Sequence, residues 1–464
     1  MSEDVLYLSV RELAARIKAR KLTSIELTEA YLSRSRTIGP KLNAYATITH
    51  ELALQEAKRA DDEIRSGKYR GLLHGIPYAA KDLLAVKGYP TTWGARPYID
   101  QKFDYDATVI EKLRQAGAVL LGKAAMIELA GGLGYRFASA SASGPARNPW
   151  NTGCWTCGSS SGSGAIASAA LAAFAIGTET WGSIVCPAAY CGVTGLRPTY
   201  GRVSRHGGMA LAFSMDKIGV IGRGADDCAI VLERISGHDP LDPSSVFGPG
   251  FVYNTVSSTR PLRIGWLLNA WKDVPKDIES LTREAVSVLK SGGAIVEETN
   301  LPDGPWEAAA NTVISVEAAA AFENLIESGR VADLSDPLGR IGGYINQQVP
   351  ASDYARALRI RGVLQKRMDK LFEEFDVVAA ASQPNSATTL DTNLETDLSF
   401  PDPLGGIGNL CGLPAISVPC GFDNRKLPVG IQFVGRALDE DKVVAAARLF
   451  QQHTEWHRKR PPIT

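Results

Sequence analysis

The chain has 464 residues, 45% of them hydrophobic and 22% charged, and its 50 basic residues balance its 50 acidic ones. This balance disfavours nucleic acid or an anionic membrane as the main partner, and no apolar run reaches the roughly 18 residues of a membrane span. The acidic start MSEDVLYLSVREL does not resemble a signal peptide, and seven cysteines do not make a disulfide framework in so long a chain. We therefore expect a soluble, reduced, cytoplasmic protein.

Alternating helical and strand patterns predict an α/β fold. Capping boxes at Ser9 and Thr23, each followed by Glu three residues later, predict two helix starts. Further helices are expected over 50–65, 106–115, 124–130, 165–176, 225–235, 275–290 and 439–452, and over most of 306–375 apart from a polar break at 334–348. Strands are expected at the segment that carries Lys81 and at 118–122, 262–267, 294–298, 376–382, 413–422 and 427–436. These elements predict one domain over residues 1–464, with 300–360 as a helical cap over the site.

The stretch from Gly153 to Leu196 is dense in serine and glycine around an apolar segment, which favours a catalytic site over a flexible linker. Within it, G-S-S-S-G at 158–162 matches a nucleophile elbow centred on Ser160. An elbow requires a strand directly before it, however, and the preceding NPWNTGCWTC is not strand-like. None of the six histidines lies in a recognisable base context, so a Ser-His-Asp triad is disfavoured.

Cys154 and Cys157 form a C-x-x-C motif, which could be a redox pair or half of a metal site. No second cysteine pair or histidine set has matching ligand spacing, so zinc is disfavoured. A phosphate-binding loop is absent as well. Serine with lysine as its base remains as the chemistry that fits the residues.

The chain resembles the amidase signature family over nearly its whole length. The matching segments, in the family's order, are GIPYAAKD (75–82), ARNPWN (146–151), GSSSGSG (158–164), GTETWGSI (177–184), PAAYCGVTGLRPTYGRVSR (187–205) and LPAISVPCGF (413–422). The resemblance implies an α/β fold in which a central mixed sheet lies between layers of helices, with no cofactor and no metal. It also implies a Ser-cisSer-Lys triad.

By this resemblance the catalytic lysine is Lys81, the bridging serine after a cis peptide bond is Ser159, and the nucleophile is Ser183. The oxyanion hole is expected from backbone N–H groups of Thr180, Trp181, Gly182 and Ser183. To act as a base, Lys81 must lower its pKa from about 10.4 to about 7, which corresponds to roughly 4–5 kcal/mol against the ammonium form. A strand position among apolar neighbours offers the burial for this, and Asp82 should point to the opposite face.

The nucleophile segment departs from the family's usual G-T-D-x-G-G-S-[IV]-R, because this chain has Glu179, Trp181 and Val185 where the family has Asp, Gly and Arg. Losing both the Asp and the Arg suggests that an ion pair is gone and that packing holds the loop. If the backbone at Trp181 must be left-handed, the residue would be strained there. We expect Trp181 to line an apolar substrate pocket. The other residues expected in this pocket are Leu133, Tyr135 and Phe137.

Two functions remain open. The first is an amidohydrolase, monomeric or homodimeric, that cleaves small amides, anilides or carbamates through an acyl-enzyme. The second is the glutaminase (A) subunit of a tRNA-dependent amidotransferase, whose relatives keep the common loop pattern that this chain lacks. Arg202 and Arg205 are expected to be structural rather than substrate-binding. A catalytically inactive binding protein is disfavoured because Lys81, Ser159 and Ser183 are all present.

Overall fold

A mixed sheet of eleven strands runs through the computed structural model, which describes residues 3–254, 260–270, 274–397 and 403–463. In spatial order the strands are β1 (Tyr45–Ile48), β3 (Val119–Ala124), β2 (Pro77–Lys81), β6 (Phe174–Glu179), β8 (Lys217–Gly222), β7 (Thr194–Arg197), β12 (Ala415–Phe422), β13 (Pro428–Gly435), β11 (Val377–Ala381), β9 (Arg263–Leu267) and β10 (Ile295–Thr299). The pairs β2–β3, β2–β6, β9–β10 and β9–β11 are parallel, and the remaining pairs are antiparallel. The α/β prediction with a central mixed sheet is confirmed.

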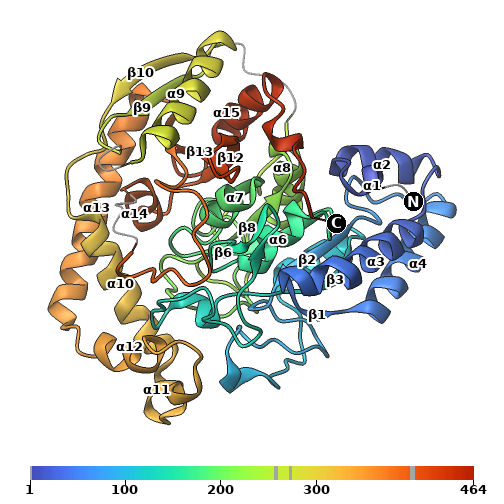
Figure 1. Ribbon diagram of the computed structural model, residues 1–464, viewed down its shortest axis with the longest axis horizontal. Helices are drawn as coiled ribbons and strands as arrows, with labels where there is room; N and C mark the ends of the chain where they lie inside the picture. Colours follow the sequence, from blue (N-terminus) through green and yellow to red (C-terminus); the bar gives the residue numbers. More distant parts are fainter. Residues whose placement is uncertain (1–2, 255–259, 271–273, 398–402, 464) are drawn as a thin grey trace.

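Helices cover both faces and both ends of this sheet (Figure 1). They are α1 (Glu3–Leu6), α2 (Val10–Lys18), α3 (Ser24–Leu42), α4 (His50–Arg65), α5 (Thr108–Gln115), α6 (Ser161–Ser168), α7 (Val185–Cys191), α8 (Ala225–Ile235), α9 (Lys276–Ser291), α10 (Trp306–Ala321), α11 (Glu323–Glu327), α12 (Gly339–Asn346), α13 (Ala351–Glu374), α14 (Pro403–Leu410) and α15 (Glu440–Gln452). The first four helices lie at one end of the molecule, and α10–α13 lie at the opposite end. Near the chain termini, Arg460 Nη1 lies 2.7 Å from Asp4 Oδ1.

Local sequence signals explain the helices at the N-terminal end. The side chains of Ser9 and Thr23 accept hydrogen bonds from the backbone N–H of Glu12 and Glu26, and both reciprocal bonds are present, so both capping boxes are confirmed. Helix α4 has the bounds that the sequence predicts. These helices pack against the β1–β3–β2 end of the sheet, which carries the strand of Lys81.

Glycines let helix α6 closely approach the sheet at Gly162 and helix α7 at Gly164. A Cβ on Gly162 would clash with the backbone oxygens of Ala44 and Ala125, and a Cβ on Gly164 would lie 3.0 Å from the carbonyl oxygen of Pro187. Only a residue without a side chain allows this contact. The serine-rich start of α6 is thereby held against the edge where β2 and β6 end.

Several expected elements differ from the structure. Residues 124–130 are not a helix, because β3 continues to Ala124 and Leu129 and Ala130 adopt left-handed φ values of 50° and 53° in a short turn. The helix expected over 165–176 ends at Ser168, and β6 begins at Phe174. The expected polar break at 334–348 contains helix α12, whose small residues pack on the chain around Leu133.

The segment NPWNTGCWTC, which looked unlike a strand, contains β5 (Asn151–Trp155). This strand pairs with β4 (Arg147–Asn148) in a two-stranded ribbon outside the main sheet. Its last residue, Trp155, is buried, and the Trp155 backbone N–H donates to the carbonyl of Thr388. The prediction failed because tertiary contacts, rather than β-forming residues, hold this short ribbon.

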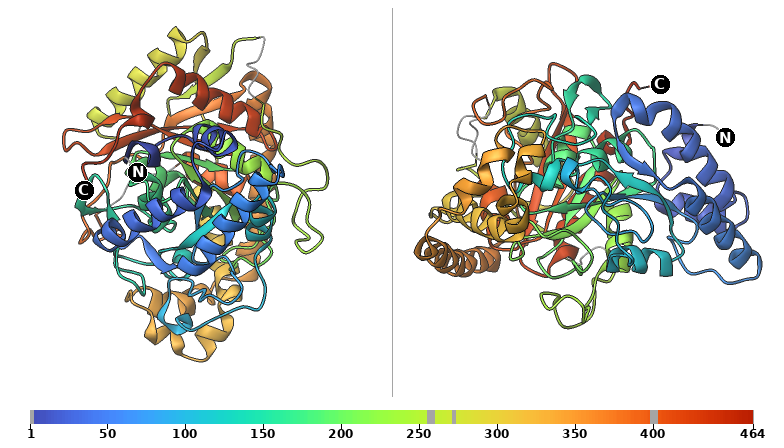
Figure 2. Two further views of the ribbon diagram at one scale, coloured as in Figure 1. Left: turned by 90° about the vertical axis from the view of Figure 1, so that its right-hand side faces the viewer. Right: turned by 90° about the horizontal axis from the view of Figure 1, so that it is seen from below.

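After α8, residues 236–254 project from the body of the molecule as an extended loop (Figure 2). Within the described ranges, no helix has the length and apolar character required to cross a membrane.

Candidate active site

Three chain segments converge where β2 and β6 end. Lys81 is the last residue of β2, and Ser183 lies in the loop between β6 and α7. Ser159 lies in the turn between β5 and α6 and follows a cis peptide bond with Gly158, as the resemblance implies. Because β2 and β6 are parallel neighbours, their carboxyl ends meet at one edge of the sheet. The topology thus brings together side chains that are far apart in sequence.

The three side chains form a continuous hydrogen-bonded chain. Lys81 Nζ lies 2.7 Å from Ser159 Oγ, and Ser159 Oγ lies 2.9 Å from Ser183 Oγ. Lys81 Nζ also donates to Thr178 Oγ1 at 2.8 Å. Lys81 is fully buried, whereas Ser183 keeps 7% exposure. This order places the serine hydroxyl at the accessible end and the amine at the enclosed end.

Burial lowers the pKa of Lys81 to about 7, and the nearby carboxylates of Asp216 and Glu179 oppose this shift. The adjacent Asp82 carboxylate is directed elsewhere, because its Oδ1 lies 3.0 Å from Lys123 Nζ and its Oδ2 accepts from the backbone N–H of Thr92. A substantial fraction of Lys81 is therefore neutral at pH 7, and a neutral amine can accept a proton.

The loop that carries Ser183 is held by a buried ion pair, so the expectation that packing alone holds it is wrong. Glu179 Oε1 lies 2.6 Å from Arg197 Nη1, and both side chains are fully buried. The other carboxylate oxygen accepts from the backbone N–H groups of Ile184 and Val185 at 2.8 and 3.0 Å. The carboxylate thus caps the N-terminus of α7, directly after Ser183.

Within this loop the left-handed residue is Gly182, with φ of 78°, and Trp181 does not have a positive φ. The strain considered for Trp181 is therefore not present. The Thr180 side chain is fixed because its Oγ1 donates to Asp216 Oδ1 at 2.5 Å. The other oxygen of this carboxylate, Asp216 Oδ2, accepts from the backbone N–H groups of Leu211 and Ala212. Thr178 and Asp216 were not singled out from the sequence, although Thr178 lies inside the GTETWGS motif.

The residues expected to line the substrate pocket lie in two parts of the chain: Leu133, Tyr135 and Phe137 share one segment, and Trp181 lies in the loop that carries Ser183. Leu133 is buried beneath α12, and Tyr135 packs edge-on against Trp155 with ring centroids 6.1 Å apart. The backbone N–H of Phe137 is fixed by Asp336 Oδ2 at 3.1 Å. Trp181 is partly buried and faces α14, where a Cβ on Gly406 would lie 3.3 Å from the Trp181 indole.

A cavity of about 180 Å³ lies beside Thr178, the hydrogen-bond partner of Lys81. Leu83, Met209, Leu211 and Ile218 give it apolar walls, and none of the four residues expected in the substrate pocket lines it. Lys217 also lines it, and burial together with Arg197 holds the pKa of this lysine below its usual range. This cavity beside Thr178 is thus formed by residues other than those that sequence reasoning selected for the pocket.

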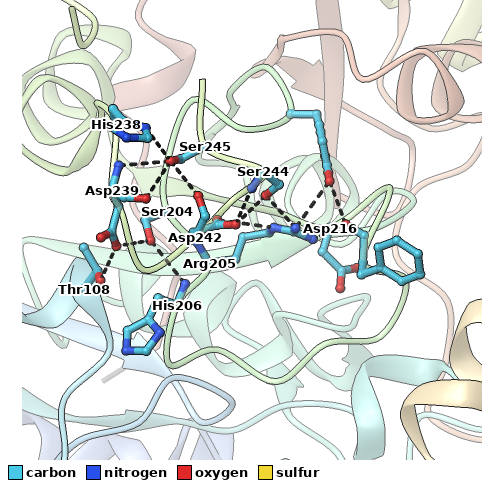
Figure 3. Close-up of polar contacts among 12 residues, drawn as sticks. Thr108, Ser204, Arg205, His206, Asp216, His238, Asp239, Asp242, Ser244 and Ser245 are labelled. Carbon is cyan, nitrogen blue, oxygen red and sulfur yellow. Dashed lines mark hydrogen bonds and ion pairs between the residues drawn. The ribbon is translucent and has the colours of Figure 1, made fainter. Parts of the chain in front are cut away.

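Figure 3 shows the polar contacts around Arg205, His206 and Asp242, three residues that line this cavity. Arg205 Nη2 donates to Ser244 Oγ at 2.6 Å, and the Arg205 backbone N–H donates to Asp242. Ser204 Oγ donates to Asp239 Oδ2 at 2.5 Å. Arg202 forms an ion pair with Glu440, in which Arg202 Nη2 lies 2.8 Å from Glu440 Oε2. Arg202 therefore has a structural contact, whereas Arg205 has structural contacts and also lines the cavity.

A disulfide joins Cys157 to Cys186, with Cα atoms 5.8 Å apart. The expectation of a fully reduced chain is wrong for this pair. Cys157 bonds to Cys186 rather than to Cys154 of the C-x-x-C motif. Because Cys157 and Cys186 are 29 residues apart in the sequence, no local motif indicated that they pair. No cluster of three metal-binding side chains occurs among residues 3–254, 260–270, 274–397 and 403–463.

Known proteins resemble this chain along nearly its whole length. A family model described as Amidase matches residues 26–444. The glutamyl-tRNA(Gln) amidotransferase A chain of Acinetobacter baumannii is 38% identical, covering 99% of each protein. The peptide amidase of Stenotrophomonas maltophilia is 33% identical with a TM-score of 0.86, covering 98% of each protein. The corresponding glutamyl-tRNA(Gln) amidotransferase protein of Thermotoga maritima is 27% identical with a TM-score of 0.79, covering 97% of this chain and 96% of that one.

Proposed function

The chain belongs to the amidase signature family, and on this basis we propose that it is an amidohydrolase that cleaves C–N bonds through a serine nucleophile. One observation carries the proposal: a buried lysine with a pKa of about 7 is hydrogen-bonded through Ser159 to Ser183. A serine is a weak nucleophile unless a base removes its proton, and neutral Lys81 is the base within reach.

In the proposed reaction, Ser183 Oγ attacks the substrate carbonyl while its proton passes to Ser159 and the Ser159 proton passes to Lys81. Before this transfer, with Lys81 neutral, Ser183 donates to Ser159 and Ser159 donates to Lys81, a direction that hydroxyl rotation allows over the observed 2.7 and 2.9 Å distances. Returning the proton through Ser159 to the leaving nitrogen breaks the C–N bond and leaves an acyl-enzyme. Water then hydrolyses the ester by the same route.

The negative oxygen of the tetrahedral intermediate requires fixed donors, and we assign this role to backbone N–H groups of Thr180, Trp181, Gly182 and Ser183. The loop is anchored at the first of these donors by Thr180 on Asp216, and after Ser183 by the Glu179 carboxylate, which accepts from the backbone N–H groups of Ile184 and Val185. Donors that are already oriented need not reorganise during the reaction, which is the basis of oxyanion stabilisation.

The proposed substrates are small amides, anilides or carbamates with an apolar group. The apolar walls of the cavity beside Thr178 and the indole of Trp181 near the nucleophile loop support this class. No cofactor or metal is needed for the proposed chemistry, and a monomer or homodimer would suffice.

The second candidate is a glutaminase component of a tRNA-dependent amidotransferase, favoured by the 38% identity to the Acinetobacter protein. The fold agreement is greater with the peptide amidase than with the Thermotoga protein, at TM-scores of 0.86 and 0.79. Co-expression with candidate partner chains separates the two functions. A protein that purifies alone and hydrolyses an anilide supports the amidohydrolase, whereas activity only in a complex with two other chains supports the glutaminase.

A hydrolysis panel tests the reaction class directly. Wild type and Ser183→Ala are assayed with an aliphatic amide, an anilide, a carbamate, an ester and glutamine. We expect turnover of at least one of the first three by wild type and loss of that turnover in Ser183→Ala. Retention of full activity in the variant would refute the assigned nucleophile.

A further inference from the structure

The disulfide links the two chain segments that carry the serines. Cys157 precedes Ser159 by two residues, and Cys186 follows Ser183 by three. The segment between the two serines, residues 160–182, includes α6 and β6, so the bond closes this loop at its base. Its position allows it to set the separation of the two hydroxyls.

On the Ser159 side, the bond secures a segment with an unfavourable backbone. Cys157 has a φ of 62°, a left-handed conformation that is unfavourable for an L-residue. The next residue is enclosed, because a Cβ on Gly158 would lie 2.6 Å from Ile127 Cγ1 and 3.0 Å from Trp155. The side chain of Ser160, at the N-cap position of α6, makes no capping bond. The turn is otherwise held by tertiary hydrogen bonds, in which Ser160 Oγ donates to the carbonyl of Thr178 and the backbone N–H of Ile127 donates to the carbonyl of Ser159.

On the Ser183 side, the bond reaches the first turn of α7. The backbone N–H of Cys186 donates to the carbonyl of Gly182 at 2.8 Å, directly before the nucleophile. The disulfide therefore connects the Ser159 turn to the same helical turn that fixes Ser183. The Glu179–Arg197 pair, by contrast, anchors the nucleophile loop to β7 and α7.

We propose that Cys157 and Cys186 are positioning residues whose disulfide holds Ser159 and Ser183 at proton-transfer distance. The inference rests on the proposed function, because it concerns the serines of that reaction. Proton relay requires the 2.9 Å contact between the two hydroxyls, and a displacement of about 1 Å can cost about 10²-fold in rate. The oxidised enzyme is therefore the fast form.

Reduction consumes two equivalents of a thiol, or one of a dithiol such as dithiothreitol. The Sγ–Sγ bond breaks, the cysteines gain two electrons and two protons as separate thiols, and the reductant is oxidised to its disulfide. Cys154 is buried, and burial raises the pKa of its thiol. Because the thiolate is the attacking species, Cys154 is a poor exchange partner for the bond and provides a matched control.

The test begins with the enzyme purified without reductant. Alkylation under denaturing conditions should label the five free cysteines and leave a linked 157–186 peptide for mass spectrometry. Dithiothreitol should then lower kcat by at least about tenfold, with a smaller change in KM. Cys157→Ala/Cys186→Ala should match the reduced wild type with and without reductant, and Cys154→Ala should match wild type in both states.

Labelling of Ser183 by an aryl sulfonyl fluoride separates failure of this inference from failure of the proposed function. No labelling of Ser183 in any state would refute the nucleophile itself. Labelling at equal rates in oxidised and reduced enzyme, or seven free thiols in fully active enzyme, would overturn only the positioning role. If the bond resists reductant in the folded enzyme, the double variant with an unchanged circular dichroism spectrum supplies the comparison. Equal kcat in that variant and in wild type also overturns the role.

Discussion

Glu179 and Arg197 form an ion pair, 2.6 Å apart, in which both side chains are excluded from solvent. The same carboxylate accepts hydrogen bonds from the two backbone N–H groups that follow Ser183, and Glu179 also accepts from Asn409 on α14 at 2.9 Å. One side chain therefore connects β6, β7, α7 and α14. The position of the nucleophile depends on this carboxylate remaining ionised.

Glu179→Gln should destabilise the protein, because it leaves the Arg197 cation buried without its counter-ion. Removing one partner of a buried pair typically costs about 3–5 kcal/mol in the free energy of unfolding. Urea denaturation of both proteins at pH 7 measures the difference. The matched control is Glu279→Gln, which breaks a solvent-exposed pair with Arg283 and should cost less than about 0.5 kcal/mol.

The pH dependence of stability should reveal the same carboxylate. Arg197 and the hydrogen bonds overcome burial and lower the pKa of Glu179 to about 2, from an ordinary 4.5. Folding therefore favours the ionised form, so its stabilisation is complete above about pH 4.5 and is lost as the pH falls towards 2. Glu179→Gln should flatten this part of the wild-type stability profile. A difference between the two proteins that stays constant from pH 7 to pH 3 would contradict the assignment.

Ser183→Ala should lower kcat/KM by at least about 10³-fold, because no other hydroxyl in the hydrogen-bonded chain is placed to attack. Ser163→Ala is the matched control. Its hydroxyl donates to the carbonyl of Ile176 within the same stretch, away from the Lys81–Ser159–Ser183 chain. Steady-state kinetics with the best substrate of the panel provide the comparison, and equal losses in the two variants would point to a general folding defect.

The rate should rise with pH through about 7, because burial lowers the pKa of Lys81 to that value and only the neutral amine accepts a proton. Lys81→Met keeps the length and apolar character of the side chain but removes the base. We expect this variant to lose most activity at pH 7 and to lack the inflection near pH 7 in its residual rate. An unchanged inflection would assign the titration to another group.

The sequence was sufficient where a signal was local or was carried by a family motif. Capping boxes predicted the starts of α2 and α3, and the motif segments led to Lys81, Ser159 and Ser183, which the fold brings together. The capping boxes depend on residues that are near neighbours in the chain, and the catalytic residues were found through short motifs that resemble those of the family.

The failures concern contacts between distant segments. Glu179 and Val185 in place of the usual residues suggested that no ion pair remained, but Arg197 supplies the cation from β7. The left-handed turn at Leu129 and Ala130 interrupts a sequence with good helix propensity. The partner of Cys157 is set by the approach of α7 to the Ser159 turn. Propensity and spacing do not encode these relationships.

Trp181 provides the last test, because it is the residue to which we assign substrate choice. Its indole lies against α14 near Gly406, and its backbone is not left-handed, so Trp181→Ala removes the ring without relieving backbone strain. The variant should change the ratio of kcat/KM between a bulky anilide and a small aliphatic amide by at least about tenfold, the range expected when a pocket loses an apolar contact. The Tm should change little, because the ring is only partly buried.

Trp456→Ala is the control for this experiment, because Trp456 is also partly buried but packs on Phe422, with ring centroids 5.9 Å apart, near the C-terminus. It should leave the selectivity ratio unchanged. If Trp181→Ala scaled the kcat/KM of every substrate in the panel by the same factor, the indole would not contact the substrate. Selectivity would then have to be sought in the cavity beside Thr178, beginning with Leu211 and Met209.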